Sequence, residues 1–141
     1  MPFVLDNSVA MRWILRDREP EAMRYASGVL RLLAEGDSVV VPAIWGLEAA
    51  NVIARSQRKG LIKEADAAEF RTLVQQLDIE ADSATHEQAL SDTYHLALRY
   101  NLFAYDASYL ELALRLGIPL ATLDAGLLEA VAEAGGRTLQ A

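Results

Sequence analysis

The hydrophobic residues of the chain gather in short uninterrupted runs that alternate with longer amphipathic segments. The runs lack the every-second-residue alternation of a half-exposed sheet, and residues 3–5 and 38–41 are apolar almost throughout. Continuous apolar strands are typical of a parallel sheet covered by helices on both faces. The predicted strands are residues 3–5, 38–41, 79–81, 119–123 and 137–140.

The segments between these runs have helical periodicity. One opens with Pro20, which suits a first helical turn, and stops before Gly36. Another begins at Thr85 with a capping-box pattern. The predicted helices are residues 9–15, 20–35, 43–58, 64–77, 85–100, 106–116 and 125–134. The predicted fold is α/β, with three layers (α/β/α), a central parallel sheet of about five strands and a single domain over residues 1–141.

Composition narrows the function classes. The 141 residues include no cysteine, which excludes a thiol nucleophile and a cysteine zinc site. The longest uncharged stretch, residues 38–47, is too short to cross a bilayer, and no secretory signal is visible, so we expect a cytoplasmic protein. The net charge is −7, and all of it lies in residues 72–141. Any contact with nucleic acid is therefore expected in the first half of the chain.

Four carboxylates are expected at one edge of this sheet. Asp6 and Asp124 each end a predicted strand. Asp106 begins a predicted helix, and Glu48 lies in the first turns of the helix that follows the second strand. The carboxyl ends of parallel strands share one edge, where ligands bind. Four carboxylates meeting there repel unless protons or a cation intervene, and an all-oxygen ligand set suits Mg²⁺ or Mn²⁺.

Each of these acids also has a simpler interpretation. Asp6, Asp106 and Asp124 could each cap the helix that follows. Glu48 could lie with Asn51 on a solvated helix face, although no Lys or Arg stands three or four residues away to pair with it. A cation site is indicated only if all four carboxylates lie close together at one edge of the sheet.

Four motifs surround the acids. They are Asp-Asn-Ser at residues 6–8, Glu48 with Asn51, Tyr-Asp-Ala-Ser-Tyr at residues 105–109, and Leu-Ala-Thr-Leu-Asp at residues 120–124. In this order they cover essentially the whole chain. Together they resemble the PIN domain, and above all the VapC-type toxin ribonucleases of toxin–antitoxin pairs.

The resemblance implies a sheet order of 3-2-1-4-5 and a toxic endoribonuclease that hydrolyses RNA phosphodiester bonds with Mg²⁺ or Mn²⁺ as cofactor. It also implies a homodimer that a VapB-like antitoxin neutralises. Catalytic and metal-binding roles carry over to Asp6, Glu48, Asp106 and Asp124, and supporting roles to Ser8, Asn51 and Thr122.

An RNA substrate requires basic residues that hold its phosphates. The candidates are Arg12 and Arg16 after the first strand, and Arg55, Arg58 and Lys59 at the end of the helix that carries Glu48. Ordinary solvated surface is the alternative for each of them.

Other function classes fit less well. A receiver domain needs a lysine late in the chain, and a haloacid-dehalogenase-type phosphatase needs a lysine and an Asp-x-Asp motif. Here the only lysines are Lys59 and Lys63, and residues 6–8 are Asp-Asn-Ser. A noncatalytic PIN-fold module that binds protein remains as the alternative, and an assay for RNA cleavage distinguishes it from an enzyme.

Overall fold

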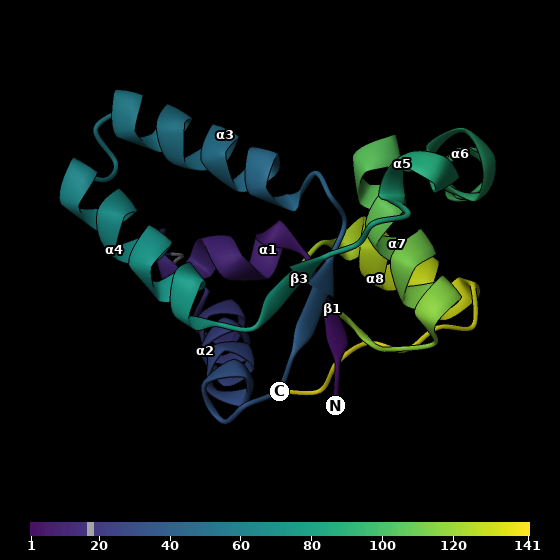
Figure 1. The fold of residues 1–141 in the computed structure, drawn as a ribbon, viewed down its shortest axis with the longest axis horizontal. Helices are drawn as coiled ribbons and strands as arrows, with labels where there is room; N and C mark the ends of the chain where they lie inside the picture. Colours follow the sequence, from purple (N-terminus) through teal and green to yellow (C-terminus); the bar gives the residue numbers. More distant parts are fainter. Residues whose placement is uncertain (17–18) are drawn as a thin grey trace.

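The computed structural model describes residues 1–16 and 19–141 (Figure 1). Its strands are β1 (Phe3–Leu5), β2 (Val39–Val41), β3 (Ile79–Ala81) and β4 (Leu120–Ala121). Its α-helices are α1 (Asn7–Ala10), α2 (Pro20–Ala34), α3 (Trp45–Arg58), α4 (Glu64–Gln76), α5 (Thr85–Gln88), α6 (Tyr94–Tyr100), α7 (Ala104–Leu116) and α8 (Ala125–Glu133). A 3₁₀ turn (Met11–Trp13) extends α1, and a π-helical turn (Ala89–Thr93) joins α5 to α6.

The sheet has the order β3-β2-β1-β4, and its strands pair in parallel. Helices α1 to α4 lie on one side of it and α5 to α8 on the other (Figure 1). The predicted three-layer α/β fold with a parallel sheet is therefore confirmed. In this topology Leu5 pairs with Ala121, so the chain leaves β1 and β4 side by side at the carboxyl edge.

The prediction of a fifth strand over residues 137–140 is wrong for the described residues, where the sheet has four strands. A single parallel bridge joins Thr138 to Leu120 in the place where that strand was expected. Two backbone hydrogen bonds support it, from Leu120 to Arg137 and from Leu139 to Leu120. The strand predicted over residues 119–123 is also shorter than expected, since β4 spans Leu120–Ala121.

Two predicted helices differ in detail. The helix expected over residues 9–15 begins at Asn7 and tightens into the 3₁₀ turn, and the one over residues 85–100 contains the π-helical turn. Thr85 forms no capping box, because its hydroxyl donates to Asp82 Oδ2 and accepts from the backbone N–H of Ala43. No helix in the described part of the chain is long and apolar enough to cross a membrane.

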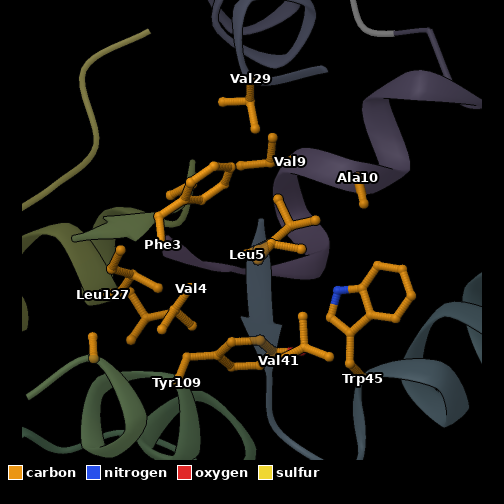
Figure 2. Packing of buried hydrophobic residues seen from close by; sticks show 14 of the residues in the cluster. Phe3, Val4, Leu5, Val9, Ala10, Val29, Val41, Trp45, Tyr109 and Leu127 are labelled. Carbon is orange, nitrogen blue, oxygen red and sulfur yellow. The ribbon is translucent and has the colours of Figure 1, made fainter. Parts of the chain in front are cut away.

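The core surrounds β1, whose three side chains are fully buried. Phe3 and Leu5 face the side chains of α1 and α2, whereas Val4 points to the opposite face, toward Tyr109 and Leu127 (Figure 2). Alternate residues of a strand point to opposite faces, so this strand anchors both helical layers. The packing fixes the position at which β1 ends and Asp6 begins.

Candidate active site

Asp6 is held rigidly at the end of β1. Its backbone N–H continues the ladder to the carbonyl of Ala121 at 3.0 Å. The hydroxyls of Ser8 and Thr122 both donate to Asp6 Oδ2, at 2.7 and 2.8 Å, and its side chain does not cap α1. Burial raises the pKa of Asp6, the two hydroxyls reduce that rise, and the charge of Asp124 adds to it.

Asp124 follows β4 and caps α8, as the simpler interpretation expects. Its Oδ2 accepts from the backbone N–H of Leu127 at 2.9 Å, and its own N–H donates to Thr122 Oγ1 at 3.0 Å. Gly126 packs closely beside this cap, since a Cβ atom there would lie 3.2 Å from Asp124 Oδ2. Asp124 is nevertheless close enough to Asp6 and Asp106 to raise the pKa of both.

Glu48 projects from the first turn of α3 and is half-buried. The hydroxyl of Tyr109 donates to Glu48 Oε1 at 2.5 Å. The interpretation of Glu48 as a solvated side chain is therefore wrong. Burial raises the pKa of Glu48, and the charges of Asp6 and Asp106 raise it further. Burial and the nearby carboxylates also raise the pKa of Tyr109, so its phenol stays protonated.

Asp106 lies in the first turn of α7 but is not its cap, because Phe103 occupies that position. Within the described residues the structure shows no side-chain hydrogen bond to Asp106, which leaves its half-buried carboxylate able to turn. Burial, with the charges of Asp6 and Asp124, raises the pKa of Asp106 to about 6. The protonation of this carboxylate therefore changes near pH 6.

The four acids therefore form one electrostatic group, in which each carboxylate is close to at least two others. None of the ion pairs that the described residues form involves any of the four. A hard cation fits this set of unpaired oxygen donors. In the described part of the chain, however, no three His, Asp or Glu side chains lie in the arrangement of a formed metal site.

The polar residues expected around the acids divide into two groups. Ser8 and Thr122 contact Asp6, whereas Asn51 is exposed one turn beyond Glu48 on α3. Sequence reasoning missed Asn7, although it stands in the quoted Asp-Asn-Ser motif, and it missed Tyr109 in the Tyr-Asp-Ala-Ser-Tyr motif. Asn7 Nδ2 donates to the hydroxyl of Tyr109 at 3.3 Å.

The candidate RNA contacts lie in two places. Arg12 and Arg16 line a cavity of about 570 Å³ between the 3₁₀ turn, α2 and α4, together with Asp66 and Glu69. The three others are exposed at the far end of α3, about two to three turns beyond Glu48: Arg55, Arg58 and Lys59. The structure leaves their role a prediction.

Comparisons with known proteins agree with this geometry. A family model described as PIN domain matches residues 3–134. A protein named Ribonuclease VapC3 from Pyrobaculum aerophilum is 27% identical over 130 residues, which cover 92% of this chain and 94% of that protein. The crystal structure of PAE2754 from Pyrobaculum aerophilum matches with a TM-score of 0.65 and 20% identity, covering 92% of this chain and 87% of that one. The last likeness shows the fold alone.

Proposed function

Because the chain belongs to the PIN domain family, we propose that it is a VapC-type toxin, an endoribonuclease that requires Mg²⁺ or Mn²⁺. The likeness to Ribonuclease VapC3 over nearly the whole of both chains supports a nuclease. The observation that carries the proposal is the meeting of four carboxylates at the carboxyl edge without a basic partner among the described residues. A noncatalytic module has no use for such repulsion.

In this proposal Asp6, Glu48, Asp106 and Asp124 hold the cation. When bound, the cation supplies an activated water and stabilises negative charge on the phosphoryl oxygens. Asp6 provides a fixed ligand, because two hydroxyls hold its Oδ2. Asp106 provides an adjustable one, since no side-chain hydrogen bond within the described residues restrains it.

The chain's own residues then orient the RNA. Arg12 and Arg16, at the cavity beside the 3₁₀ turn, and Arg55, Arg58 and Lys59, at the end of α3, would hold its phosphates. Hydrolysis by water makes no use of the 2′-hydroxyl as a nucleophile. The preference for RNA must therefore come from shape and contacts.

A basic segment of a VapB-like antitoxin is the partner that we propose for the same acidic edge. The four carboxylates attract an arginine, and this attraction would place the segment in competition with the cation. We also propose a homodimer in the cytoplasm. Its support is the large apolar side chains that this single chain leaves exposed on α6 and the turn before it, Leu90, Tyr94 and Leu98.

The test is cleavage of a panel of transfer, ribosomal and messenger RNA by the purified, antitoxin-free protein. We expect cleavage with Mn²⁺ or Mg²⁺, loss of cleavage with a chelator, and products with 5′-phosphate and 3′-hydroxyl ends. Intact RNA under all of these conditions would favour the noncatalytic module.

A further inference from the structure

A chain of buried polar side chains leads to Glu48. Asn7 Nδ2 donates to the carbonyl of Trp45 at 3.0 Å and to the hydroxyl of Tyr109 at 3.3 Å, and Tyr109 donates to Glu48 Oε1. The participants come from α1, α3 and α7, on both sides of the sheet. The Tyr109 ring extends from α7 toward Val41 in the core (Figure 2). It is fully buried, and Asn7 is only 6% exposed.

The donors and acceptors of this chain can be oriented in one way only. The Trp45 carbonyl accepts and cannot donate, so it identifies the amide nitrogen as the end of Asn7 that faces it. The same nitrogen cannot accept, so the Tyr109 oxygen is the acceptor of the second bond. The single proton of the phenol is then directed at the carboxylate of Glu48.

Packing does not explain these polar groups. A phenylalanine would fill the space of the Tyr109 ring, and burying a hydroxyl or an amide is unfavourable unless a hydrogen bond compensates for it. Asn7 adds a further unfavourable contribution to the free energy of folding, because its Oδ1 is buried without a hydrogen-bond partner among the described residues. These residues thus keep a locally unfavourable arrangement that ends on one carboxylate, that of Glu48.

We propose that Tyr109 is a positioning residue for the cation site: its hydroxyl holds the Glu48 carboxylate at the acidic edge, and Asn7 directs that hydroxyl. This inference rests on the proposed function. A glutamate side chain otherwise loses its rotamer freedom when it binds a ligand. A hydrogen bond to an ionised carboxylate is stronger than a neutral one, and such outer partners orient metal ligands.

The experiment compares Tyr109→Phe with Tyr25→Phe. Both remove a phenol hydroxyl that donates one hydrogen bond, but Tyr25 donates to the backbone carbonyl of Leu139, away from the acids. We expect Tyr109→Phe to weaken Mn²⁺ binding about 10- to 100-fold, measured from the electron paramagnetic resonance signal of free Mn²⁺. Tyr25→Phe should leave the affinity unchanged.

A double-mutant cycle separates positioning from a general structural effect. In a Glu48→Ala background, Tyr109→Phe should weaken Mn²⁺ binding little further, because the hydroxyl has lost the group that it positions. A purely structural hydroxyl would instead lower the melting temperature of the metal-free protein and leave Mn²⁺ affinity as in the parent.

The outcomes distinguish this inference from the proposed function. Unchanged or tighter Mn²⁺ binding by Tyr109→Phe overturns the inference alone, provided that Asp106→Asn weakens binding. A parent protein that shows no Mn²⁺ binding sensitive to Asp106→Asn overturns both. Should Tyr109→Phe fail to fold, Asn7→Leu keeps the phenol and removes a donor that acts on both the Tyr109 hydroxyl and Glu48. Unchanged affinity in that variant would equally overturn the inference.

Discussion

Two groups of acids in this molecule have opposite electrostatic surroundings. In the first, near the C-terminal end of α7, Arg115 contacts Asp82 at 2.7 Å and Glu111 at 2.6 Å. Burial alone would raise the pKa of Asp82, but hydrogen bonds from Arg115 and Thr85 bring it below its usual value. In the second, at the carboxyl edge, the pKa values of Asp6, Glu48 and Asp106 are all raised.

The difference shows what each group contributes. The Arg115 group compensates for its buried charges inside the protein, and it ties α7 to the segment after β3. The carboxyl edge leaves its charges uncompensated among the described residues, so it destabilises the metal-free fold and favours a cation. The Arg115 group therefore stabilises the fold, whereas the carboxyl edge carries a repulsion that mutation can relieve.

The largest effect is expected from Asp106→Asn. Loss of this ligand should reduce Mn²⁺-dependent cleavage by roughly 100-fold or more, since removal of an outer partner alone costs up to about that much. The metal-free variant should unfold at the same or a higher urea concentration than the parent, because one repelling charge is gone. Glu129→Gln, which neutralises an exposed acid on α8, is the matched control. An unfolded Asp106→Asn protein would show that this side chain supports the fold.

The converse change is Arg115→Met. It leaves Glu111, which is 4% exposed, without its cationic partner, and should lower the free energy of unfolding by about 2 kcal/mol in urea titrations. Mn²⁺ affinity should stay within about twofold of the parent, since Arg115 contacts none of the four acids. Arg31→Met breaks only a long surface pair with Glu35 at 4.0 Å and should cost less than about 0.5 kcal/mol. If Arg115→Met and Arg31→Met lower the free energy of unfolding equally, the Arg115 group contributes no more to stability than a surface ion pair.

The two groups should also respond oppositely to pH. Because the pKa of Asp106 is about 6 when folded and 3.8 in the reference state, the metal-free fold loses stability as pH rises between these values. Asp82 has a lowered pKa, so its stabilising contribution is present above pH 3.8 and disappears at lower pH. Mn²⁺ affinity should fall about fivefold from pH 6 to pH 5 by calorimetry, since one proton on a group of pKa about 6 competes with the cation. An affinity independent of pH in this range would exclude Asp106 as a ligand.

The smallest effect concerns the double role of Asp124. Asp124→Ala should destabilise the protein by about 1 kcal/mol in urea, because α8 loses its cap. Asp124→Asn keeps a capping oxygen and should retain that stability while weakening Mn²⁺ binding. If Asp124→Asn binds Mn²⁺ like the parent, Asp124 belongs to the helix cap alone.

Sequence predicted the end of β1 directly before Asp6 correctly, but the strand predicted over residues 119–123 is too long, because β4 ends at Ala121, three residues before Asp124. Uninterrupted apolar runs located β1 and β4, and the parallel arrangement then brought Asp6 and Asp124 to one edge. The same reasoning predicted a strand after Gly136, where the structure has a single bridge. Residue type shows that a segment can be extended, but it does not show whether an adjacent strand offers enough residues to pair with it. Strand length is a property of two segments together.

Hydrogen-bond partners far apart in the chain were not predictable in this way. Asn7 and Tyr109 are 102 positions apart, and Tyr109 has the helical spacing of an ordinary core residue. Thr85 had the pattern of a cap, yet its hydroxyl accepts from the backbone N–H of the distant Ala43 and donates to Asp82, three residues before it. Local pattern predicts what a side chain can do, whereas the fold decides which partner it meets.

The most direct measurement is an anomalous diffraction map of crystals grown with Mn²⁺. We predict a manganese peak at the carboxyl edge, with oxygens of Asp6 and Asp106 within about 2.5 Å of it and Glu48 or Asp124 completing the site. A map with no manganese at this edge, in which Asp106 points away and Asp124 only caps α8, would contradict the central claim that these carboxylates share one cation.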